Sequence, residues 1–150
     1  MSISFNELNA GVIMQISTAT YDTLRNSKLL LRLAYAFLFL AAGADKFFDI
    51  ITYWPKYVSP VLLKLVATPI ENFVMGVGIF EVVLGLLFLS PFSRLASYIA
   101  FLWLMAIAVN LLSMHAFIDI AARDIVLAIG ALVLGKLTSV VTRISRQDLN

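Results

Sequence analysis

Four long apolar runs, separated by short polar breaks, constrain the fold of this chain more than any other feature. The runs cover residues 29–50, 69–89, 94–114 and 123–141. Each is close to the roughly 20 residues that an α-helix needs to cross a hydrocarbon core of about 30 Å. A segment in lipid must satisfy its backbone hydrogen bonds internally, so spans of this kind are helices. The sequence therefore predicts an all-α integral membrane four-helix bundle over residues 29–141.

The composition supports this class and excludes several others. The 150 residues are 61% hydrophobic and only 13% charged, far more apolar than a water-soluble domain. A net charge of +2 is too small to indicate nucleic-acid binding. The chain has no cysteine, which excludes disulfides, thiolate metal sites and covalently attached haem within it. We therefore expect no covalently bound cofactor and no metal site, and any electron carrier must come from outside the chain.

The two ends of the chain flank the predicted bundle. Residues 1–28 form an N-terminal cytoplasmic or interfacial segment, and residues 142–150 form a cytoplasmic tail. The start does not resemble a signal peptide, because no Lys or Arg precedes its apolar residues. A helix on the membrane surface is predicted over residues 4 to 18, with a disordered polar tail as the alternative. It rests on a capping box of Ser4 with Glu7 and on the helical spacing of Phe5, Leu8, Val12 and Ile16.

A segment between the first two spans, residues 51–69, is neither a tight turn nor polar enough to leave the membrane. Its aromatic residues suit the headgroup level. Ser59 as N-cap and Pro60 at the first helical position predict a short interfacial helix through Ala67. Thr68 with Glu71 predicts a capping box for the second span.

The basic residues predict the orientation. Four spans put both termini on one side of the membrane. Seven basic residues fall on that side and four on the other: Arg25, Lys28, Arg32, Arg94, Lys136, Arg143 and Arg146 against Lys46, Lys56, Lys64 and Arg123. The side richer in positive charge is usually cytoplasmic. We therefore expect cytoplasmic N- and C-termini.

Glu81 is the most informative polar residue. It lies about ten residues into the second span, which is about 15 Å deep and close to the bilayer midplane. An ionisable group at that depth is costly and should face the bundle interior. A stripe of small and apolar residues carries it: Val74, Gly78, Gly85 and Phe88. Glu81 is either part of a ligand site or a hydrogen-bonding contact between helices.

Several other polar residues gather at the ends of the spans opposite the termini. Asp45 and Asp49 are four apart, on one face of the first predicted helix. We expect one of them to pair with Arg123 or Lys46 across the mouth of the bundle. The predicted polar vestibule, with Glu81 below it, consists of Asp45, Lys46, Asp49, Asn110, His115, Arg123 and Asp124.

Each residue of the vestibule also has a purely structural interpretation. Asn110 is either a ligand contact or a hydrogen bond between helices. His115 is either a proton acceptor near Glu81 or a solvated helix end. Asp124 is explained by the dipole of a helix that begins at Arg123. The charged side chains together are explained by snorkelling to the interface.

The stretches FLFLAAGADKF, GIFEVVLGLLFLSPFSRLAS and NLLSMHAF resemble the DoxX-like family of small four-helix membrane proteins. The resemblance covers residues 29–135, is most specific over residues 81–94, and departs from the family at the C-terminal end. It implies a bacterial or archaeal cytoplasmic membrane, and in some members a link to quinone-dependent sulfur oxidation or to oxidative-stress complexes. Lys46, Glu81 and His115 match recurring polar positions of the family.

Three functions stay open at this point. The first is a redox-associated membrane subunit that binds quinone and works with a membrane-bound or peripheral redox partner. The second is a non-enzymatic assembly or accessory subunit that packs against a partner or a second copy through its small residues. The third is a small-solute transporter acting as a homo-oligomer. Whether the protein is an enzyme is undetermined, and no residue is assigned as catalytic.

Overall fold

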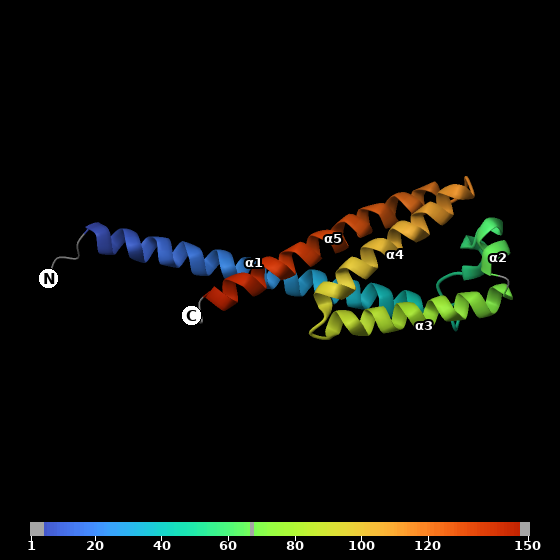
Figure 1. Ribbon diagram of the computed structural model, residues 1–150, viewed down its shortest axis with the longest axis horizontal. Coiled ribbons are helices and arrows are strands. Elements are labelled where there is room, and N and C mark those ends of the chain that lie inside the picture. The colour runs from blue at the N-terminus through green and yellow to red at the C-terminus, as the bar shows by residue number, and fades with distance from the viewer. Residues whose placement is uncertain (1–4, 67, 148–150) are drawn as a thin grey trace.

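A computed structural model describes residues 5–66 and 68–147, and Figure 1 shows its arrangement. These residues form five α-helices and one 3-10 helix. In chain order they are α1 (Phe5–Asp45), the 3-10 helix η1 (Trp54–Tyr57), α2 (Pro60–Val66), α3 (Ile70–Leu89), α4 (Ser93–Ser113) and α5 (Ile118–Gln147). The all-helical class is confirmed.

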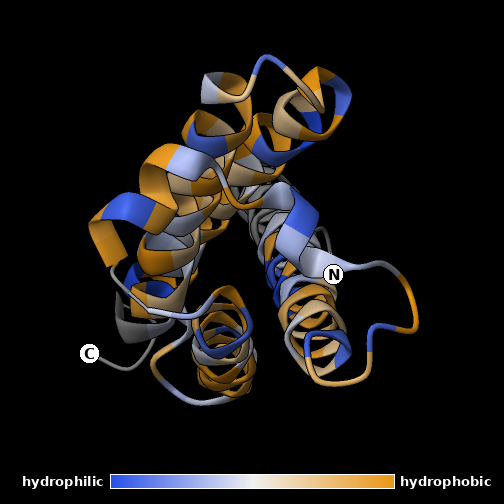
Figure 2. Ribbon diagram, turned by 90° about the vertical axis from the view of Figure 1, so that its right-hand side faces the viewer, coloured by the Kyte–Doolittle hydropathy of each residue, from blue (hydrophilic) through white to orange (hydrophobic). Residues whose placement is uncertain are grey.

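Four of these helices are long and apolar enough to cross a membrane: Thr18–Asp45 within α1, Ile70–Leu89, Ser93–Ser113 and Ile118–Ser145. Many large apolar side chains on these helices are exposed. The hydropathy colouring of the ribbon in Figure 2 shows how frequent hydrophobic residues are along the helices. Phe37, Leu30 and Leu102 are 75%, 71% and 66% exposed. Because large exposed apolar surfaces are stable only in lipid or at an interface, the protein is a multi-pass membrane protein.

The four spans form two helix pairs. α1 packs mainly against α3, and α4 packs mainly against α5. The pairs lie close together in the middle of the molecule and separate toward the end that carries α2 (Figure 1). The described ends of α1 and α5 both lie at the opposite end. Both chain ends therefore lie at one end of the bundle, as an even number of spans requires.

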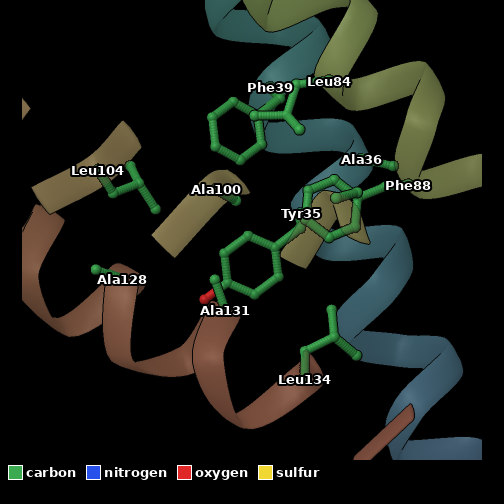
Figure 3. Packing of buried hydrophobic residues seen from close by; sticks show 11 residues of the cluster. Tyr35, Ala36, Phe39, Leu84, Phe88, Ala100, Leu104, Ala128, Ala131 and Leu134 are labelled. Carbon is green, nitrogen blue, oxygen red and sulfur yellow. The ribbon is translucent and has the colours of Figure 1, made fainter. Parts of the chain in front are cut away.

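A buried cluster joins the two pairs. α1 contributes Tyr35, Ala36 and Phe39 to it, and these side chains are at most 5% exposed. The rings of Tyr35 and Phe39 each stack on Phe88 of α3, with centroids 5.5 and 6.0 Å apart. Small residues of α4 and α5 face these rings, which Figure 3 shows for Ala100, Ala128 and Ala131. Large rings on one side thus fill the space that small residues leave on the other.

The ends of two helices differ from the prediction. The first helix was expected to reach Ile50 but ends at Asp45, and it begins at Phe5 without a break before the span. Its 41 residues extend about 60 Å along one axis, so the predicted N-terminal helix continues the span and does not lie across it. Ser4, its predicted cap, lies outside the described residues.

The last helix also starts earlier than predicted. It begins at Ile118 and not at Arg123, and it includes residues 142–147 of the predicted tail. Asp119 is the acidic residue of its first turn, while Asp124 lies in the second turn. The explanation of Asp124 by the helix dipole is therefore wrong, because that effect is confined to the first turn.

The predicted short helix between the first two spans is confirmed as α2, which begins at Pro60 as expected and ends at Val66, while Ala67 lies outside the described residues. The Ser59 hydroxyl accepts a hydrogen bond from Leu62 N at 3.2 Å, as a helix N-cap does. The capping box at the start of α3 is wrong: Pro69 is the N-cap, and no side chain caps the helix. The Thr68 hydroxyl donates instead to the carbonyl of Val66 at 3.1 Å.

Arg32 holds the turn between α3 and α4. Its guanidinium donates to the carbonyls of Phe88, Leu89 and Ser90, the last at 3.0 Å. The last carbonyls of a helix have no partner within it, and a cation suits the negative end of its dipole. Arg32 therefore stabilises the tight connection that brings α3 back as α4.

Candidate functional site

A cavity of about 770 Å³ opens between the two helix pairs, at the end of the molecule that carries α2. Its wall is mainly apolar, with side chains from every span and from the interfacial segment. Five charged or amide side chains also line it: Lys46, Glu81, Asn110, Arg123 and Asp124. The cavity therefore combines a large apolar volume with a few polar groups, as small-molecule sites do.

An ion pair between Lys46 and Glu81 forms the polar centre of the cavity. Lys46 Nζ lies 2.5 Å from Glu81 Oε2, and the two side chains are only 6% and 4% exposed. Lys46 Nζ also donates to the carbonyl of Ala42 at 3.3 Å. The other carboxylate oxygen of Glu81 accepts from Trp103 Nε1 at 3.2 Å. Both oxygens of the buried carboxylate thus have a donor.

Trp54 completes the group from the interfacial segment. Lys46 Nζ lies 3.6 Å from the centroid of its ring, within the range of a cation–π contact. Lys46 directly follows α1, while Glu81, Trp54 and Trp103 belong to α3, η1 and α4 respectively. We call these four residues the paired cluster. The sequence predicted two of them as site residues and did not single out the tryptophans as partners.

Two glycines bring α1 and α3 close enough for the ion pair to form. A Cβ on Gly43 would lie 2.8 Å from both Gly78 O and Val82 N. A Cβ on Gly78 would lie 2.9 Å from Gly43 O and 3.0 Å from Lys46 Cβ. Each glycine thus faces the backbone of the other helix at a distance that no side chain allows. The predicted small-residue stripe around Glu81 is buried, and this close approach explains it.

Asp45 does not form the predicted ion pair. It is 5% exposed, and its Oδ1 accepts from the backbone N–H groups of Ile50 and Ile51 at 2.9 and 2.8 Å. Its Oδ2 accepts from Trp54 Nε1 at 2.8 Å. Asp45 therefore folds the chain back after α1 and fixes the tryptophan that covers Lys46.

Asp49 is not on the same helix face as Asp45, contrary to the prediction. It lies beyond the end of α1, is exposed, and has a positive φ of 49°. Asp residues tolerate this left-handed conformation in turns. The two acids therefore do not form the like-charge pair that a longer helix would have created.

Arg123 pairs with Asp119 and not with Asp45 or Asp49. Arg123 and Asp119 lie one turn apart on α5. A guanidinium nitrogen of Arg123 is 3.3 Å from Asp119 Oδ2, and the two side chains are 73% and 67% exposed. Exposed pairs of this kind contribute little to stability. The predicted pairing of Asp45 or Asp49 with a base across the mouth of the bundle is wrong. Lys46 forms an ion pair with Glu81 instead, and Arg123 forms one with an acid of its own helix.

Asp124 is a carboxylate without a direct partner in the cavity. It is half-buried and lines the wall, and within the described residues it makes no hydrogen bond or ion pair. The sequence placed it in the vestibule but assigned it no role in the site. The available signal was its position one turn before Ala128 and two turns before Ala131, because these small residues are buried in the bundle interior.

Asn110 ties α4 to the interfacial segment. Its Oδ1 accepts from Ser59 N at 3.1 Å, and its Nδ2 donates to Tyr57 O at 2.6 Å. These two hydrogen bonds are enough to explain an amide at this position by a structural role, although the side chain also lines the cavity. The contact is with the loop and not with another span, which differs from the interhelical bond that the sequence suggested.

His115 lies outside the cavity wall. It is exposed in the turn between α4 and α5, with a positive φ of 51°. The structure thus does not bring it to Glu81. Among the described residues, no group of three His, Cys, Asp or Glu side chains is arranged to hold a metal ion.

The comparison with known proteins agrees with this architecture. The DoxX family model matches residues 27–116, which is more than half of the chain and includes Lys46, Glu81, Trp103 and Asn110. The match ends earlier than the resemblance that we found by inspection, so all of α5 lies outside it. Comparisons with curated proteins and with solved structures found no match. On the family match and the four-span architecture, the chain belongs to the DoxX family.

Proposed function

We propose that this protein binds a lipid-soluble quinone in the cavity and acts as a redox-associated membrane subunit. The observation that carries the proposal is the buried Lys46–Glu81 pair in the wall of a largely apolar cavity. A quinone combines the same two kinds of group as the cavity, because it has an apolar tail and a flat ring that bears two carbonyl acceptors. The family resemblance, which extends to quinone-linked members, supports the same class of ligand.

The residues of the cavity suit the chemistry of such a ring. The Lys46 ammonium has three donor hydrogens, and a hydrogen bond from it to a carbonyl is charge-assisted. The rings of Trp54 and Trp103 line the same wall and offer surfaces for stacking. A quinone that gains two electrons also takes up two protons, and Glu81 and Asp124 are carboxyl groups placed to exchange them. The electrons come from a redox partner in this proposal.

The cavity has a size and an opening that fit a lipid-soluble ligand. Small-molecule sites usually have about 300–1,000 Å³, and the 770 Å³ found here lies within that range. Val61, Leu65 and Val109 line the cavity and are also exposed on the outside of the molecule. An apolar ligand can therefore enter from the bilayer side without crossing water.

Two alternatives have less support. A transport path through the chain is not favoured, because the buried cluster of Phe39, Phe88 and Leu104 fills the space toward the other end. Assembly through small residues is not favoured either, because Gly78, Gly85 and Gly135 pack inside this chain. We propose further that the protein resides in the cytoplasmic membrane with both termini in the cytoplasm, where a second copy or a redox partner joins it.

The test is a titration of the purified full chain, in nanodiscs of synthetic lipid, with a short-tailed ubiquinone or menaquinone. The protein contains two tryptophans, and both line the cavity, so bound quinone should quench their fluorescence in a saturable way. Lys46→Met should weaken binding roughly tenfold or more, since it removes a charge-assisted hydrogen bond.

The matched control is Lys56→Met, which removes an exposed lysine of η1 that does not line the cavity. It should bind quinone as the unchanged protein does. Quenching that does not saturate, or equal affinities for Lys46→Met and Lys56→Met, would contradict the proposal. Extraction of purified protein with organic solvent should in addition release quinone carried from the native membrane.

A further inference from the structure

A second hollow lies at the opposite end of the molecule, between α1 and α5. Its volume is about 310 Å³. Two cations and three hydroxyl groups are among the side chains that line it: Tyr21, Arg25 and Lys28 from α1 with Val141, Thr142 and Ser145 from α5. Nothing in the quinone proposal uses this site, which we call the basic groove.

Among the residues that the structure describes, no acidic side chain forms an ion pair with either cation of the groove. Arg25 and Lys28 are three residues apart, so they lie on the same face of α1, and Arg32 follows one turn later. Within the described residues the ion pairs are Lys46–Glu81 and Arg123–Asp119, both at the other end of the molecule. Like charges this close repel one another, so an anion between them relieves an unfavourable interaction.

Hydroxyl groups from both helices also line the groove. Thr142 already donates to the carbonyl of Thr138 at 2.8 Å, which leaves its oxygen as an acceptor only. The hydroxyls of Tyr21 on α1 and Ser145 on α5 are the candidate donors in the lining. Arg25 supplies a planar set of donors that matches the oxygens of a phosphate, and Lys28 supplies a compact charge beside it.

The depth of the groove matches a headgroup. The apolar run of α1 begins at Leu29, directly after Lys28, and the apolar run of α5 ends at Val141, directly before Thr142. The groove thus lies where both helices leave the hydrocarbon core, at the level of phospholipid phosphates. Basic pockets between spans at this level are known to hold anionic headgroups.

We propose that the basic groove binds a phosphate-bearing anion, held by Arg25 and Lys28 of α1 and by the hydroxyl groups of Tyr21 and Ser145. The phosphate belongs either to an anionic phospholipid of the leaflet at the terminal end or to a free phosphate. By holding the anion, the groove joins α1 to α5 at an end where the core cluster no longer connects them.

The test uses the full chain purified in a mild detergent and three probes at equal concentration: short-chain phosphatidylglycerol, short-chain phosphatidylcholine and inorganic phosphate. Binding is read by native mass spectrometry and by the shift of the thermal unfolding midpoint. The double variant Arg25→Gln/Lys28→Gln should bind the preferred probe about 30-fold more weakly, since each basic residue near the surface contributes about a fivefold gain.

The matched control is Arg94→Gln/Lys136→Gln, which removes two exposed basic residues on the same side of the bundle but outside the groove. Binding of phosphatidylglycerol alone identifies a lipid headgroup, and equal binding of inorganic phosphate identifies a free anion; both support the site. If the two double variants lose affinity equally, or if no probe binds, the proposal is overturned. Lys28→Arg should retain binding, which separates loss of the site from loss of the fold.

Discussion

In the paired cluster, Glu81 is unfavourable for folding when it is unpaired, yet it supplies a polar group to the cavity. Glu81 lies in the middle of α3, where an unpaired carboxylate would be strongly unfavourable. Lys46 supplies the opposite charge from 35 residues earlier, and the two tryptophans fill the remaining contacts of the pair. Every member of the cluster depends on another, so the energetic effect of removing one depends on which partner remains.

We therefore expect Lys46→Met to lower the free energy of unfolding by about 3 kcal/mol or more, because it leaves the buried Glu81 carboxyl group without its counter-ion. The double variant Lys46→Met/Glu81→Gln should be less destabilised than Lys46→Met alone, since a neutral amide needs no counter-charge. The measurement is thermal unfolding of the purified protein in detergent, followed by circular dichroism.

Arg123→Gln serves as the comparison, because it removes one partner of an exposed ion pair. It should change the free energy of unfolding by less than about 1 kcal/mol. If the loss of stability in Lys46→Met/Glu81→Gln equals the sum of the losses in Lys46→Met and Glu81→Gln, the two side chains do not act as a pair.

At the scale of elements, the contact between α1 and α3 depends on glycine. Gly43 and Gly78 each present backbone to the other helix, and this contact positions Lys46 over Glu81. Gly76 lies on the same helix as Gly78, yet a Cβ there would meet nothing within 4 Å. Gly76 and Gly78 therefore have opposite consequences for packing, although they are only two residues apart.

Gly43→Ala should destabilise the protein, because the added methyl group would lie 2.8 Å from two backbone atoms and α1 would have to move away from α3. Gly76→Ala should be neutral or slightly stabilising, since alanine favours a helix by about 1 kcal/mol over glycine. Thermal unfolding in detergent measures both. Equal unfolding midpoints for the two variants would contradict the close contact between the helices.

At the scale of the whole molecule, two helix pairs meet in the middle and separate toward the end that carries α2. The buried cluster closes the space between them toward the termini, and the cavity occupies the space at the other end. The protein is thus asymmetric along the membrane normal. The apolar cavity faces one side of the membrane, and the basic groove faces the other.

The orientation of this asymmetric molecule can be measured. A reporter that is fluorescent only in the cytoplasm should be bright when fused after Asn150 or before Met1, because the side with the termini carries more basic residues. A cysteine introduced at Lys56, in a chain that otherwise has none, should react with a membrane-impermeant reagent added from outside the cell. Labelling at Lys56 only after the membrane is opened would reverse the proposed orientation.

The sequence by itself determined the class of the protein, the four spans, the short helix after Ser59 and the buried face of α3 around Glu81. These follow from local properties, because hydrophobic length, helix spacing and capping residues each belong to a single helix. It also indicated Lys46 and Glu81 as site residues, but it could not pair them. Which acid meets which base depends on how closely two helices approach, and that distance is set by Gly43 and Gly78.

Only the tertiary structure decided the rest of the site. Asp45 accepts hydrogen bonds from residues that follow it, so α1 ends there and Asp49 leaves the helix. Arg123 pairs along its own helix, and His115 lies in an exposed turn. The cavity itself exists because the two helix pairs separate at one end, a property that no single helix carries in its sequence.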